Sequence, residues 1–120
     1  MFIRDLSSCK EITAGDSTLL RELLNPLKDP LNLRYSLAIA RVRPGVTTRL
    51  HRLKNSEVYY IVSGEGEMVV DAEHERVNPG CAVYIPPGST QQIKNIGDRP
   101  LVFLCIVDPA WRQEDEEILG

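Results

Sequence analysis

The chain has 120 residues, 42% of them hydrophobic and 26% charged, which is typical of one soluble globular domain. Its 14 basic and 17 acidic side chains give a formal net charge of −3, which argues against nucleic-acid binding, because nucleic-acid-binding domains are usually basic. No stretch approaches the roughly 20 apolar residues of a membrane helix, and the N-terminus lacks a secretory apolar run. We therefore expect a cytoplasmic protein with no membrane partner, and three widely spaced free thiols, Cys9, Cys81 and Cys105, fit that compartment.

Residues 1–32 are predicted to form an N-terminal extension that packs on the rest of the domain. Within it, the stretch DSTLLRELLNP (16–26) fits two structures equally well. One is a helix capped by Asp16 with four leucines on one face, and the other is an edge strand.

From residue 33 onward, short runs of β-forming residues alternate with turn signals rich in glycine, proline and asparagine. This pattern predicts an antiparallel sandwich or barrel over residues 33–108. The expected strands are 33–42, 47–53, 57–63, 66–71, 81–86, 90–95 and 101–107. Residues 109–120 are acidic and are expected to form a short helix or a loose, solvated tail.

The predicted strand 57–63, EVYYIVS, is apolar on both faces apart from Glu57. Because successive side chains of a strand point to opposite faces, one face fills the interior and the other also needs cover. A second sheet or a second copy of the chain can provide that cover, and exposed strand edges also favour pairing between chains. We therefore expect a homodimer.

Two spaced motifs carry the chemistry of the chain. The first reads G-x5-H-x-L-x3-E-x6-G from Gly45 to Gly64, and the second reads G-x5-P-x-G-x2-Q-x3-N from Gly80 to Asn95. Together they resemble the two motifs of the cupin superfamily, G(X)5HXH(X)3–4E(X)6G and G(X)5PXG(X)2H(X)3N. The resemblance implies an all-β double-stranded β-helix, that is, a jelly-roll barrel.

In that family the motifs supply a metal site of three histidines and one glutamate, which correspond here to His51, Leu53, Glu57 and Gln91. Leu53 cannot bind a metal, and the amide oxygen of Gln91 is a weaker donor than imidazole. The resemblance thus implies a weak or altered site for a divalent metal (Zn, Ni, Mn or Fe) at His51, Glu57 and Gln91, or no metal at all. The competing interpretations are a hydrogen-bonded interior histidine at 51 and a barrel-lining amide at 91.

Strand periodicity adds residues to the expected pocket. Positions 47, 49, 51 and 53 share one face of a regular strand, so Arg49 and Leu53 are predicted to line the cavity beside His51. Tyr59 is predicted to join them because it shares a face with Glu57. Arg49 has three interpretations: contact with an acidic ligand, structural pairing with Glu57, or a side chain that reaches out of the barrel mouth. His74 is expected in a solvated surface turn.

Three functions remain open at this point. The first is a small-molecule-binding protein with an altered metal site, acting as an isomerase- or dioxygenase-like enzyme on a small polar or acidic substrate. The second is a metal-free ligand-binding or sensing module in which Arg49 anchors an acidic ligand. The third is a structural role in which the pocket is only core.

Overall fold

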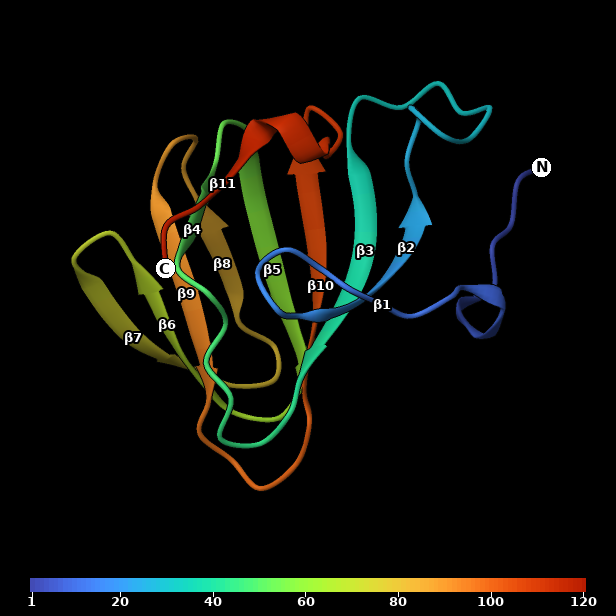
Figure 1. The fold of residues 1–120 in the computed structure, drawn as a ribbon. Coiled ribbons are helices and arrows are strands. Elements are labelled where there is room, and N and C mark those ends of the chain that lie inside the picture. The colour runs from blue at the N-terminus through green and yellow to red at the C-terminus, as the bar shows by residue number, and fades with distance from the viewer.

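The computed structural model describes all 120 residues, and it consists of two antiparallel sheets that face each other (Figure 1). The first sheet has the strand order β1 (Ile12–Thr13), β2 (Leu19–Leu24), β3 (Ser36–Val42), β10 (Leu101–Asp108), β5 (Ser56–Ser63) and β8 (Ala82–Ile85). The second has the order β11 (Glu116–Ile118), β4 (His51–Leu53), β9 (Thr90–Asn95), β6 (Gly66–Val70) and β7 (Glu73–Val77). This architecture confirms the expected all-β jelly-roll barrel.

The helical content is limited to two short 3-10 segments, η1 (Leu6–Ser8) and η2 (Gln113–Asp115). Neither has the length or the apolar character needed to cross a bilayer. Within the stretch 16–26, which fits a helix or a strand by sequence, residues 19–24 form strand β2, and β1 pairs with its outer side.

Besides β1, two strands lie where no strand is expected. Strand β7 pairs with β6 and contains His74, which is exposed as expected but sits in a strand and not in a turn. Four of the five residues of its EHERV sequence are polar and exposed, so the strand lacks the alternation of apolar and polar residues by which strands are recognised. The other unexpected strand is β11, in the acidic tail.

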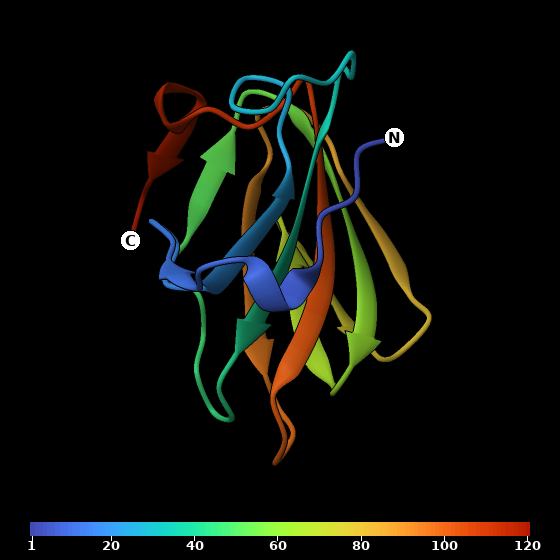
Figure 2. The ribbon, with the colours of Figure 1, turned by 90° about the vertical axis from the view of Figure 1, so that its right-hand side faces the viewer.

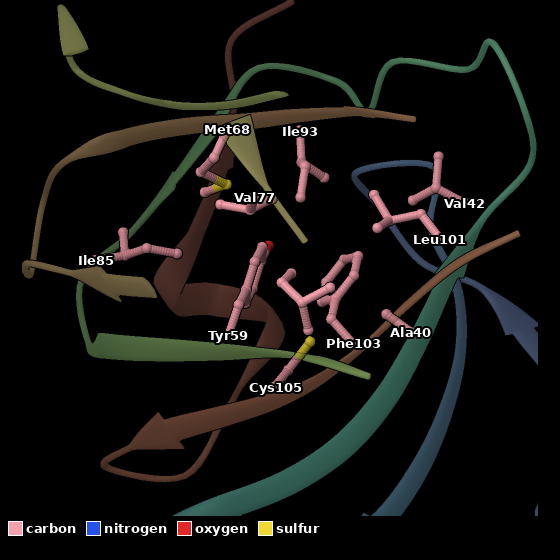
Figure 3. Packing of buried hydrophobic residues seen from close by; sticks show 11 residues of the cluster. Ala40, Val42, Tyr59, Met68, Val77, Ile85, Ile93, Leu101, Phe103 and Cys105 are labelled. Atoms are coloured by element: carbon pink, nitrogen blue, oxygen red, sulfur yellow. The ribbon is translucent and has the colours of Figure 1, made fainter. Parts of the chain in front are cut away.

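The core lies between the two sheets (Figure 3). Along β10, alternate side chains point inward, and the strand pairs with β3 on one side and β5 on the other, so its apolar face becomes the centre of the sheet. The ring of Tyr59 packs against that of Phe103, with centroids 4.3 Å apart and planes tilted by 32°. Both side chains belong to a cluster of 11 buried residues.

Motif residues outside the four positions that correspond to metal ligands have structural roles. Gly64 has a φ of +85°, and a Cβ there would lie only 2.7 Å from the carbonyl oxygen of Pro100. Asn95 is fully buried, and its Nδ2 donates to the carbonyls of Val42 at 2.8 Å and Arg99 at 2.7 Å. These residues therefore close the turns between strands.

Both ends of the chain contribute to the barrel. Strand β11 pairs with β4, with Glu116 opposite Leu53 and Ile118 opposite His51, and Figure 2 shows the two strands side by side. The acidic tail therefore contains a short helical segment, η2, as expected, but it is not a loose extension, because β11 joins the second sheet. At the other end, the segment that includes β1 passes in front of β5 and β10 (Figure 1), and its residues line the same cavity as Tyr59 and Phe103.

Candidate functional site

A cavity of about 340 Å³ lies between the two sheets, beneath the two chain ends. His51, Leu53, Glu57 and Tyr59 line it from the barrel strands. Residues 12–16 line it from the N-terminal segment, and Trp111, Glu116 and Ile118 from the C-terminal segment. The cavity is therefore enclosed jointly by the barrel, by residues 12–16 and by the segment 111–118.

His51 begins β4 and is buried, with 4% of its surface exposed. Its Nδ1 lies 2.8 Å from the carbonyl oxygen of Arg49. A carbonyl only accepts hydrogen bonds, so Nδ1 carries the proton and, in the neutral ring, Nε2 carries the lone pair. That Nε2 faces Asp16, 3.5 Å from its Oδ2. The backbone thus fixes the tautomer that presents a proton acceptor.

Asp16 is the site residue that the sequence did not reveal, since the motif pattern assigned it at most a helix-capping role. Its Oδ1 accepts from the backbone N–H of Thr18 at 3.0 Å and from the Thr18 hydroxyl at 2.7 Å. This turn leaves Oδ2 free to face His51. The Asp-x-Thr pattern is typical of such a turn, but it carries no information on the distant partner.

Glu57, Gln91 and Tyr59 form a buried chain of hydrogen bonds. The Nε2 of Gln91 donates to Oε1 of Glu57 at 2.9 Å, and the Tyr59 hydroxyl donates to Oε1 of Gln91 at 2.8 Å. Gln91 is fully buried and is opposite His51 in the β4–β9 pair, yet it does not line the cavity. Both polar ends of its amide are used by protein groups.

Burial strongly raises the pKa of the Glu57 carboxyl group. Desolvation raises its pKa from 4.5 to about 8, and the hydrogen bond from Gln91 only partly opposes this. The nearby charges of Asp16 and Glu116 raise the pKa further. Glu57 is therefore mostly protonated at neutral pH, and Tyr59, whose pKa burial raises well above 10, stays protonated as well.

Arg49 does not lie where strand periodicity predicts. Its side chain is exposed, and its Nε donates to the carbonyl oxygen of Gly120 at 2.9 Å, outside the cavity. Regular alternation fails because β4 begins only at His51. Before it, the N–H of Thr48 donates to Ile93 and that of Arg49 donates to Asp16, which buries Thr48 and turns Arg49 outward. Arg49 therefore neither pairs with Glu57 nor faces a ligand.

The residues present do not fit the divalent metal that the fold implies. No three His, Cys, Asp or Glu side chains gather closely enough to share an ion. Glu57 and Gln91 are hydrogen-bonded to each other, and Gln91 does not line the cavity. His51 Nε2 is the one imidazole donor that faces the cavity.

Comparison with known proteins agrees with this fold. A model of the cupin domain matches residues 38–107. The uncharacterized protein MJ1618 of Methanocaldococcus jannaschii is 43% identical over 111 residues, which cover 92% of this chain and 88% of that protein. The L-ectoine synthase of Aliivibrio fischeri is 24% identical over 110 residues, covering 91% of this chain and 86% of the synthase.

A crystal structure of a cupin 2 conserved barrel domain protein from Salinispora arenicola superimposes with a TM-score of 0.77. The overlay covers 95% of this chain and 91% of that one at 24% identity, so it supports the fold alone. The family model and the MJ1618 match go further, because each extends over more than half of the chain. The chain therefore belongs to the cupin domain family.

Proposed function

We propose that this cupin binds a small molecule in the cavity between its sheets and transfers protons to and from it without a tightly held metal. One observation carries the proposal. A carboxylic acid that is mostly neutral at pH 7, Glu57, and an imidazole with its acceptor nitrogen turned inward, His51, line the same cavity. Groups of this kind serve as general acid and general base.

Glu57 as the acid and His51 as the base each have a neighbouring side chain that assists the proton transfer. Gln91 donates a hydrogen bond to one carboxyl oxygen of Glu57, so the other oxygen is left to carry the proton toward the cavity. The Asp16 carboxylate stabilises the imidazolium that forms when His51 accepts a proton, because Oδ2 already faces Nε2. His51 can thus accept a proton with the Asp16 carboxylate beside it, whereas the Glu57 carboxylate that remains after proton donation keeps only the hydrogen bond from Gln91.

The cavity volume and walls suit a small ligand. At about 340 Å³ it falls at the lower end of the range of small-molecule sites. Its apolar walls include Leu53, Tyr59, Phe103 and Trp111. The likeness to L-ectoine synthase over nearly the whole chain supports an enzymatic role over simple binding.

A melting-temperature screen of small molecules tests the binding step. Ligands should raise the melting temperature of the wild type but not that of Ala38→Phe, which places a large side chain in the cavity. The control is Val46→Phe, because Val46 is exposed in a loop and does not line the cavity. Hits that stabilise all three proteins equally would contradict binding in the cavity.

The alternative is the sequence-based one, a weakly held divalent ion at His51, Glu57 and Gln91. The inward lone pair of His51 favours it, but Glu57 and Gln91 would have to give up their mutual hydrogen bond. Elemental analysis after incubation with Zn, Ni, Mn or Fe decides between the two. Metal retained by the wild type and lost from His51→Ala supports the ion, whereas equal content in both proteins supports the metal-free site.

We also propose a homodimer in which a second copy covers the outer face of the first sheet. Tyr60, Val62 and Tyr84 are exposed on this face, at 43%, 45% and 63% of their surface. Strand β8 forms the edge of the sheet beside β5 and has no further partner strand. An apolar face next to an open edge suits a symmetric contact in which each copy presents the same surface.

A further inference from the structure

The charged side chains around the cavity are mostly acidic. Four carboxyl groups line it, those of Asp16, Glu22, Glu57 and Glu116, whereas Lys28 is the only lysine or arginine among the lining residues. The Nζ of Lys28 lies 2.8 Å from Oε1 of Glu22, so these two charges offset each other. Glu57 accepts the hydrogen bond from the Nε2 of Gln91. The charges of Asp16 and Glu116 remain to be balanced.

Neither of these two carboxylates contacts a lysine or an arginine. Oδ1 of Asp16 accepts the hydrogen bonds of its own turn, and Oδ2 faces only the imidazole of His51. Oε2 of Glu116 accepts from the indole N–H of Trp111 at 2.9 Å. Its Oε1 lies beside Gly15, the neighbour of Asp16, at 3.3 Å from where a Cβ would be. Both carboxylates therefore have an oxygen with no strong donor.

The imidazole of His51 is an independent indication of a ligand. Only 4% of the residue's surface is exposed, and its Nε2 lines the cavity without a hydrogen-bond donor. The Asp16 Oδ2 atom lies 3.5 Å away on the same wall, so one N–H donor of a molecule in the cavity can reach both acceptors. The acceptors on the cavity wall thus call for a ligand rich in N–H donors.

We propose that the ligand of this cavity is a small organic cation whose ammonium group is bound by Asp16 and Glu116, with an aliphatic or aromatic body against the apolar wall. An ammonium group supplies up to three donors and a positive charge. Trp111 contributes to the same site, because its indole N–H donates to Glu116 and orients that carboxylate. This inference rests on the proposed function, since it specifies the class of molecule that the cavity takes.

The structure does not support the acidic ligand that the sequence suggested. That expectation depended on Arg49, which lies outside the cavity and bonds to Gly120. A carboxylate ligand would enter beside Asp16 and Glu116, and like charges repel strongly where water is scarce. The cavity therefore selects against anions.

Three probes with the same carbon chain test the charge preference: n-pentylamine, n-pentanol and pentanoate, measured by calorimetric titration at pH 7. The amine is expected to bind at least about tenfold more tightly than the alcohol, and pentanoate is expected not to bind. An alcohol or acid that binds as tightly as the amine overturns the cation preference but leaves the small-molecule cavity standing. If none of the three binds, both this inference and the proposed function fail for ligands of this size.

Matched variants locate the binding groups. Asp16→Asn keeps an oxygen for the Thr18 turn, and Glu116→Gln keeps one for the Trp111 indole, so each removes charge with little change of fold. Each is expected to weaken n-pentylamine about tenfold while leaving n-pentanol unchanged. Glu117→Gln is the control, because Glu117 is exposed on the same strand, pairs with Arg52 and does not line the cavity. Equal weakening by the control overturns the assignment.

Discussion

The carboxyl group of Glu57 accepts a hydrogen bond from the amide of Gln91 at 2.9 Å, and no cation faces the pair. Because burial opposes the charge of Glu57, folding favours its protonated form and raises its pKa from 4.5 to about 8. Glu57 therefore couples the stability of the whole fold to pH.

The first prediction concerns the sign of this coupling. Between pH 4.5 and 8 the unfolded chain has lost the Glu57 proton while the folded protein keeps it. Stability from this group is thus complete below pH 4.5 and is lost as pH rises through 8, with a slope of at most about 1.4 kcal/mol per pH unit. Urea unfolding of the wild type and Glu57→Gln measures it. The variant should become more stable relative to the wild type as pH rises, and a difference that does not change with pH would contradict the prediction.

The second prediction concerns the tautomer of His51. Since Nδ1 faces the carbonyl of Arg49, the neutral ring should carry its proton on Nδ1 and leave Nε2 bare. Long-range ¹H–¹⁵N correlation spectra distinguish the two nitrogens. His74, which is exposed on β7, provides the reference for a solvated ring in the same sample. A neutral His51 protonated on Nε2 would rule out its role as the inward acceptor.

The third prediction compares two glycines with similar backbone conformations. Gly45 has a φ of +77° and open space where a Cβ would lie, whereas Gly64 has a φ of +85° and a Cβ would meet Pro100 at 2.7 Å. Gly45→Ala should cost about 1–2 kcal/mol in free energy of unfolding, from the left-handed backbone alone. Gly64→Ala should cost at least about 3 kcal/mol, since the backbone must also shift. Equal costs in chemical unfolding would mean that the close approach is not rigid.

The fourth prediction concerns assembly. If a second copy covers the outer face of the first sheet, Tyr60→Lys and Val62→Lys should each convert a dimer to a monomer in light scattering, because each buries a charge in the contact. Val46→Lys is the control, since Val46 is similarly exposed, at 38%, but lies in a loop outside that sheet. A wild-type monomer at high concentration, or dissociation by the control as well, would refute this contact.

The fold could be predicted from the sequence because it depends on local features: glycines and prolines at turns, alternating apolar residues, and two motifs with fixed spacing. Arg49 shows where such reasoning fails. Its orientation depends on hydrogen bonds from residues 48 and 49 to β9 and to Asp16, which no periodicity encodes. The contact between Asp16 and His51 could not be predicted either, because it joins segments that are distant in the chain. Strand β11 forms from polar, acidic residues because β4 offers a free edge.

The division between the barrel and the chain ends has an evolutionary consequence. The family model matches residues 38–107, whereas Asp16, Trp111 and Glu116 lie outside that range and line the cavity. Proteins that share the barrel can therefore acquire different ligands by exchanging only their ends, without disturbing the core that folds them. Relatives that resemble this chain in the barrel alone are poor guides to its ligand, and those that also match in residues 12–18 and 111–118 are the better ones.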